Sequence, residues 1–171
     1  MSGNKEIERK FVVFGRPDGV LSDSKRIEQK YLPLQNPMMQ LRLRRKGLDK
    51  LMEIKMRTGV DGERFETDPP FIMNSHPEIF EALWETCTKE GGIDKERFPI
   101  SNNDAGVKEI VFDVYHGNLE GRSTLEVEFL TAGQMAAWQP PAWMCQAGYK
   151  EVTGDERYDN DSLAEKGWPE D

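Results

Sequence analysis

Polar and apolar residues alternate along much of this chain with the two-residue period of a β-strand. In the first such stretch Glu6, Glu8 and Lys10 share one face, while Ile7 and Phe11 share the other. Further stretches repeat the pattern, with these polar sets on one face: Gln40, Arg42, Arg44 and Lys46; Glu53, Lys55 and Arg57; Glu109, Asp113 and Tyr115; Glu126 and Glu128. Each strand is therefore predicted to have one charged and one apolar face.

Turn residues between these stretches delimit the predicted elements. Strands are predicted at 5–14, 25–33, 38–46, 50–58, 62–68, 93–100, 107–116 and 123–130, with a short extended segment at 148–152. A helix is predicted from Ser75 to Cys87, with Ser75 as N-cap and Glu78 three residues later. Short helices are predicted at 131–138 and 162–166, and residues 140–143 as a rigid connector. These elements predict an α+β fold in a single domain over residues 1–171.

The charges on the predicted strands are separated by sign, whereas solvated faces usually mix signs. Basic residues gather in segment 42–57, and acidic residues in 6–8, 109–113 and 126–128. The strands are numerous enough to close an antiparallel barrel, which would turn the charged faces into a common lumen and the apolar faces toward helices. The alternatives are a sheet with its charged face in water, or charges that merely pair across a closed barrel.

Composition narrows the classes of function. A net charge of -8 and a pI near 5.0 argue against a nucleic-acid partner, which needs a basic surface. The absence of a long apolar run or an apolar leader predicts a cytoplasmic protein that does not enter the membrane. Cys87 and Cys145 lack metal-ligand spacing and are predicted to be free thiols, and His76 and His116 are predicted to be structural.

The acidic faces call for a cation. Glu6 and Glu8 lie ~6.6 Å apart along a strand, and at an effective dielectric of about 20 they repel by about 2.5 kcal/mol. An all-oxygen ligand set without His or Cys favours Mg²⁺ or Mn²⁺, shared with substrate phosphates. The basic faces are predicted to clamp phosphate oxygens through Arg42, Arg44, Lys55 and Arg57, joined by Lys10.

At these residues the sequence resembles a known family. Glu6-Ile7-Glu8-Arg9-Lys10 is similar to the ExExK signature of the CYTH domain, also called the triphosphate tunnel metalloenzymes. The resemblance continues in order through the strands of Arg42, Lys55, Lys95, Asp113 and Glu126, and through a closing YxNxxL motif from Tyr158 to Leu163. It implies an eight-stranded antiparallel closed barrel with flanking helices, which binds a triphosphate and a divalent metal in a charged tunnel.

The resemblance also implies the roles of individual residues. The metal-facing set is Glu6, Glu8, Glu66, Asp113, Glu126 and Glu128. On the fifth strand the family's acids align with Glu66 and Asp68, or with Glu63 and Glu66. The phosphate-binding set is Lys10, Arg42, Arg44, Lys55, Arg57, Lys95, Arg97 and Arg157. Similar short bacterial members often carry a basic residue where this chain has Glu156, which leaves Arg157 as the cation of that motif.

Similar proteins hydrolyse tripolyphosphate or thiamine triphosphate, and some cyclise ATP. The short basic segment 40–57 most resembles the small bacterial tripolyphosphatases. We therefore expect a metal-dependent enzyme that cleaves tripolyphosphate to pyrophosphate and phosphate, with Lys95 or Lys55 as the base that prepares water. The alternatives are a class IV-type adenylate cyclase, a thiamine triphosphatase, and a non-catalytic polyphosphate or nucleotide sensor. The oligomeric state stays open, with a homodimer among the alternatives.

Overall fold

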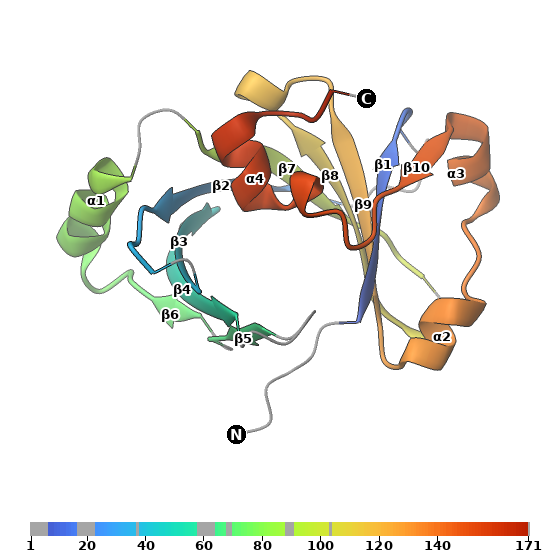
Figure 1. Cartoon of the computed structure of the whole chain (residues 1–171), viewed down its shortest axis with the longest axis horizontal. Helices are drawn as coiled ribbons and strands as arrows, with labels where there is room; N and C mark the ends of the chain where they lie inside the picture. Colours follow the sequence, from blue (N-terminus) through green and yellow to red (C-terminus); the bar gives the residue numbers. More distant parts are fainter. Residues whose placement is uncertain are drawn as a thin grey trace. The chain divides into compact units, whose positions relative to one another are not determined.

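The computed structural model describes residues 7–16, 23–36, 38–57, 64–67, 70–87, 91–102 and 104–170. The chain divides into two compact units, which are described one at a time. The first comprises Met1–Lys5, Arg26–Asp94 and Asn160–Asp171, and the second Glu6–Lys25 and Lys95–Asp159. Both contain antiparallel strands and helices (Figure 1).

The first unit is built on a meander of strands. Its elements are β2 (Lys25–Leu32), β3 (Met39–Lys46), β4 (Asp49–Arg57), β5 (Arg64–Glu66), β6 (Phe71–Ile72), α1 (Pro77–Thr86) and α4 (Asn160–Lys166). The strands pair β2 with β3, β3 with β4, and β4 with both β5 and β6. Leu43 of β3 packs with Phe80 and Trp84 of α1, so that helix covers the apolar face of the sheet. The polar face of β3 and β4 is turned away from α1.

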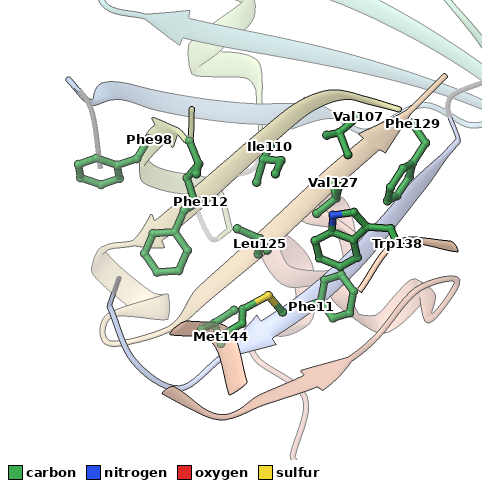
Figure 2. Close-up of a cluster of buried hydrophobic side chains, with 12 residues drawn as sticks. Phe11, Phe98, Val107, Ile110, Phe112, Leu125, Val127, Phe129, Trp138 and Met144 are labelled. Atoms are coloured by element: carbon green, nitrogen blue, oxygen red, sulfur yellow. The ribbon is translucent and has the colours of Figure 1, made fainter. Parts of the chain in front are cut away.

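The second unit holds the larger hydrophobic core. Its elements are β1 (Glu8–Val13), β7 (Ile93–Pro99), β8 (Val107–Tyr115), β9 (Ser123–Phe129), α2 (Ala132–Ala137), α3 (Ala142–Ala147) and β10 (Tyr149–Glu151). The first two residues of β7 are counted with the first unit. Strand β1 pairs with β9 and β10, and β8 pairs with β7 and β9. Figure 2 shows Phe11, Leu125 and Val127 gathered with Trp138 and Met144 on one side of these strands.

The predicted alternation is confirmed on β9. On β9, Leu125 and Val127 are fully buried, whereas Glu126 and Glu128 on the other face keep partial exposure. The apolar side is covered by α2 and α3, which flank the second unit's strands. Helix α2 begins after Thr131, whose side-chain oxygen accepts a hydrogen bond from the Gln134 N–H. The core thus takes the apolar face, and the charged face is left for function.

Two local predictions are wrong. Helix α1 has His76, not Ser75, at its N-cap position, and no side chain caps it. The reason is Pro77: its ring presets the helical φ at the first position and disfavours the helical conformation for the residue before it. Residues 140–143 are not merely a connector, because α3 begins at Ala142 and buries Met144 completely. The short strand β6 was not predicted at all.

The predicted α+β class is confirmed, with antiparallel strands and flanking helices. No series of strand pairings among the described residues closes on itself, so the predicted closed barrel is not confirmed. Cys87 and Cys145 are free thiols, as predicted. In the part of the chain that the structure describes, every helix is too short or too polar to span a membrane. The single domain stays a prediction.

Candidate active site: two charged clusters

The first unit carries a charged group on the polar face of β3 and β4. It consists of Arg42, Arg44, Glu53 and Lys55 and is named here the basic cluster. Arg42 lies opposite Glu53 in the strand register, and its Nε donates to Glu53 Oε2 at 2.6 Å. Arg44 Nη1 lies 3.5 Å from the other oxygen, Glu53 Oε1. Two guanidinium groups therefore hold one carboxylate, and the charge of Lys55 also acts on it.

The basic cluster is largely removed from solvent. The side chains of Arg42 and Glu53 are only 10% and 12% exposed. Burial alone would raise the pKa of Glu53, but the hydrogen bond and charge of Arg42, and then the charge of Arg44, lower it overall. Glu53 is therefore ionised at neutral pH. A guanidinium pair held in this way presents donors suited to phosphate oxygens.

Neutral polar groups extend the basic cluster onto neighbouring elements. Gln29 is fully buried on β2, and its Nε2 donates to the Tyr31 hydroxyl at 2.7 Å. Burial raises the pKa of Tyr31, so its hydroxyl keeps its proton at neutral pH. Gln40 of β3 donates to Asp161 Oδ2 of α4 at 2.6 Å. The polar face is thus hydrogen-bonded well beyond its charged members.

The second unit carries a different group, in which cations and carboxylates alternate. It consists of Lys10, Lys95, Arg97, Asp113 and Glu126 and is named here the paired cluster. Lys95 Nζ donates to Asp113 Oδ2 at 2.6 Å, and Arg97 donates to both Asp113 oxygens at 2.6 and 2.7 Å. Arg97 also reaches Glu126 Oε2 at 2.7 Å, and Lys10 lies 3.2 Å from Glu126 Oε1. Both carboxylates are therefore held by cations.

The pKa shifts in the paired cluster follow from burial and neighbouring charge. Burial, and then the charge of Arg97, lowers the pKa of Lys95 to about 8, even though Asp113 opposes the shift. Burial alone would raise the pKa of Glu126, but the charges of Lys10 and Arg97 hold it well below its usual range. Lys95 is therefore the cation in this cluster most easily made neutral near physiological pH.

Two more carboxylates lie beside the paired cluster. Glu8 of β1 and Glu128 of β9 are opposite each other in the strand register, and Glu128 Oε1 accepts from Lys108 Nζ at 2.6 Å. No group of three or more acidic, His or Cys side chains forms a metal cluster among the described residues. A site of two carboxylates nevertheless fits Mg²⁺, which keeps several waters and completes its shell with substrate phosphates. The donor chemistry of Glu8 and Glu128 matches the predicted metal.

The structure brings together many of the predicted site residues. The basic cluster unites Arg42, Arg44 and Lys55, and the paired cluster unites Lys10, Lys95 and Arg97 with two predicted acids. The predicted separation of signs is wrong for the second unit. Its cations lie between the carboxylates because unpaired buried charges cost more than paired ones.

Other predicted residues lie elsewhere or beyond description. Glu6, Glu63 and Asp68 lie outside the described residues. In the register of β4 and β5, Glu66 lies opposite Lys55 and Arg57 lies opposite Arg64. Arg157 is mostly exposed and binds Asp155 at 2.6 Å in the turn before α4.

Sequence reasoning gave no role to several polar residues of the site. Gln29 and Tyr31 share the polar face of β2 but carry no charge, so the search for alternating charged residues did not select them. Thr124, fully buried, lies opposite Asp113, and its hydroxyl is 3.4 Å from the Tyr115 hydroxyl. Glu53 belonged to a predicted ladder, but nothing in the sequence says which cation it binds. Thr124 lies two residues before Glu126, and Glu53 lies two residues before Lys55, so each shares a strand face with a predicted site residue. This spacing is the signal that could have identified them.

The chain was compared with known families, proteins and solved structures. No family profile matches the sequence. The chain is 34% identical to an inorganic triphosphatase of Nitrosomonas europaea over 159 residues, which cover 93% of this chain and 96% of that protein. It is also similar to the solved structure of the inorganic triphosphatase NE1496, with 33% identity, a TM-score of 0.65 and 93% of each chain covered.

A more distant likeness agrees on the fold. The structure of the putative adenylyl cyclase HpAC1 from Hippeastrum, described as having a dominant triphosphatase activity, is 14% identical, with a TM-score of 0.52. It covers 77% of this chain and 82% of that one, and at this identity it shows the fold alone. Because the chain is 34% identical to the Nitrosomonas triphosphatase over 93% of its length, it belongs to the CYTH domain, or triphosphate tunnel metalloenzyme, family.

Proposed function

We propose that this protein is a divalent-metal-dependent triphosphatase that cleaves inorganic tripolyphosphate to pyrophosphate and phosphate. The observation that carries the proposal is the 34% identity, over 93% of the chain, to a protein named inorganic triphosphatase. The two charged clusters support it, because they supply cations for phosphate and carboxylates for a metal. The closed eight-stranded barrel and the cytoplasmic location belong to this proposal as sequence-based expectations.

Substrate binding is assigned first to the basic cluster. Its guanidinium groups are held by Glu53, and their forked donors suit the oxygens of a polyphosphate. Phosphoryl transfer depends mainly on positioning and on neutralising the charge of the transferred group, so these cations also favour the transition state. The further residues proposed to contact phosphate are Lys10, Arg57, Lys95, Arg97 and Arg157.

The metal is assigned to the carboxylates beside the paired cluster. Glu8 and Glu128 are proposed as its main ligands, supported by Glu126 and by the predicted acids Glu6 and Glu66. Asp113 belongs to the same acidic set, and since both of its oxygens accept from Lys95 and Arg97, its proposed part is to hold those two cations. When bound, Mg²⁺ or Mn²⁺ polarises phosphate oxygens and makes water a better nucleophile.

Lys95 is the favoured residue to receive the proton of the attacking water. Its Nζ is held by Asp113 at a fixed place in the sheet, and its lowered pKa makes the neutral amine accessible near neutral pH. Lys55 remains the other candidate. It lies in the basic cluster, where its charge is one of three that lower the pKa of Glu53, and a cationic role there suits phosphate binding.

The test is a phosphate-release assay with Mg²⁺ or Mn²⁺ on tripolyphosphate, ATP and thiamine triphosphate. The proposal predicts metal-dependent release, with the highest kcat/KM for tripolyphosphate, because the cations of the two clusters suit phosphate groups and no segment of the sequence marks a nucleobase pocket. Pyrophosphate plus cyclic AMP from ATP would identify a cyclase instead. Binding without any phosphate release would identify a sensor, and highest efficiency with thiamine triphosphate would change the substrate.

A further inference from the structure

Glu53 is an acidic side chain at the centre of a site built for anions. Its two oxygens face different guanidinium groups, Arg42 Nε at 2.6 Å and Arg44 Nη1 at 3.5 Å. It is nearly buried and ionised at neutral pH because of those same neighbours. A carboxylate in this position occupies Arg42 Nε and lies near Arg44, two cations that a phosphate oxygen could also use.

The contacts of Glu53 with Arg42 and Arg44 would compete with a bound phosphate for the same two cations. A phosphate bound by Arg42 and Arg44 would come close to the Glu53 carboxylate, in surroundings where screening by water is reduced. The like charges would repel, so each phosphate bound there must overcome Glu53. In the free protein, the Glu53 carboxylate offsets the mutual repulsion of Arg42 and Arg44.

We propose that Glu53 is an internal counter-anion, which competes with substrate phosphate for Arg42 and Arg44 and so limits the affinity of the basic cluster for a polyphosphate. The inference rests on the proposed function, since it takes the basic cluster as the phosphate site. Glu53 acts through the two arginines and is a positioning residue. It trades substrate affinity for stability of the free protein, so removing its charge should move these two quantities in opposite directions.

The experiment is calorimetric titration of the full chain with tripolyphosphate in the absence of divalent metal, so that no turnover occurs. Glu53→Gln keeps an oxygen that can accept from Arg42 but removes the charge. We expect it to bind tripolyphosphate about ten-fold more tightly than the wild type, a change of about 1.4 kcal/mol. Its melting temperature without ligand should fall, and tripolyphosphate should raise that temperature more than it does for the wild type.

The matched control is Glu81→Gln. Glu81 also bridges two cations of β3 and β4, Arg45 and Lys50, but it does so from α1 on the opposite face of the sheet. Its loss should leave tripolyphosphate affinity unchanged. If Glu53→Gln does not fold, Glu53→Asp keeps the charge on a shorter side chain that cannot hold both contacts, and an increase in affinity of about three-fold is expected.

The outcomes separate this inference from the proposed function. Wild-type protein that fails to bind tripolyphosphate would contradict the phosphate site itself. Wild-type protein that binds, with Glu53→Gln or the folded Glu53→Asp binding no more tightly, would overturn the counter-anion role and leave the proposed function standing. An equal gain of affinity in Glu81→Gln would also overturn it, because the effect would then be one of net charge alone.

Discussion

The basic cluster and the paired cluster are built from the same kinds of residue and differ in how their charges are balanced. In the basic cluster three cations share one carboxylate, whereas in the paired cluster three cations share two. The centre of the paired cluster is also drier, with Lys95 and Asp113 1% and 0% exposed. In the paired cluster each carboxylate is held by two cations, whereas in the basic cluster two guanidinium groups share one carboxylate.

This difference teaches which cluster is suited to each part of a reaction. The guanidinium groups of the basic cluster, held by a shared carboxylate, are suited to attract an anionic ligand. A dry cluster of balanced charge shifts pKa values instead, as the lowered pKa of Lys95 illustrates. We therefore assign binding of the phosphate chain to the basic cluster and proton handling to the paired cluster. The predictions below test that assignment.

The largest effect is expected where the paired cluster meets the proposed metal. Glu128→Gln should abolish metal-dependent phosphate release, because it removes a proposed ligand charge while the ion pairs of Lys95 and Arg97 stay intact. Glu126→Gln is less informative, since it also breaks contacts to Lys10 and Arg97. The measurement is phosphate release against Mg²⁺ concentration, with exposed Glu78→Gln as the control. Full activity of Glu128→Gln at limiting metal would remove it from the site.

A large loss of stability is expected when the paired cluster is unbalanced. Asp113→Asn leaves Lys95 without its carboxylate in a dry site, and breaking a buried ion pair in this way costs about 3–5 kcal/mol. Urea denaturation measures the free energy of unfolding. Asp94→Asn removes an exposed pair with Arg26 and should cost about 0–1 kcal/mol. Equal losses of unfolding free energy in the two variants would contradict the larger cost expected for breaking the buried ion pair.

A smaller, pH-dependent effect is expected in the basic cluster. The folded-state pKa of Glu53 lies below its ordinary value of 4.5, so the stability due to ionised Glu53 is fully present above about pH 4.5. It is lost as pH falls through the folded pKa. The difference in unfolding free energy between wild type and Glu53→Gln should therefore shrink in acid, as measured by urea denaturation at several pH values. A constant difference from pH 7 to pH 3 would contradict the lowered pKa.

The sequence predicts the two faces of β9 well, because the two-residue period places alternate side chains on opposite faces. Glu126 and Glu128 stay on the polar face while Leu125 and Val127 enter the core, as the alternation requires. Helix ends are predicted less well. The N-cap falls on His76 because Pro77 constrains the backbone of the residue before it. Helix α3 forms where Met144 can enter the core, and that position exists only in the folded sheet.

The sequence also predicts which residues are charged but not which of them pair. Asp113 and Arg97 come together because β7 and β8 pair in a particular register, and that register depends on packing across the sheet. The same holds for Arg42 and Glu53 on β3 and β4. In the sequence, basic and acidic residues gather in separate segments. In the folded second unit, cations and carboxylates alternate.

The most direct test of the division between the clusters is the initial-rate kinetics of tripolyphosphate hydrolysis with Mg²⁺ for Arg44→Ala and Lys95→Ala. Loss of one charge-assisted contact worth about 1.5–3 kcal/mol should raise KM for Arg44→Ala roughly 10- to 100-fold with little change in kcat. Lys95→Ala should lower kcat far more than it changes KM, because a group that accepts the proton acts in the transition state. If both variants change the same parameter, or Lys95→Ala keeps a normal kcat, the assignment of binding to one cluster and proton transfer to the other is contradicted.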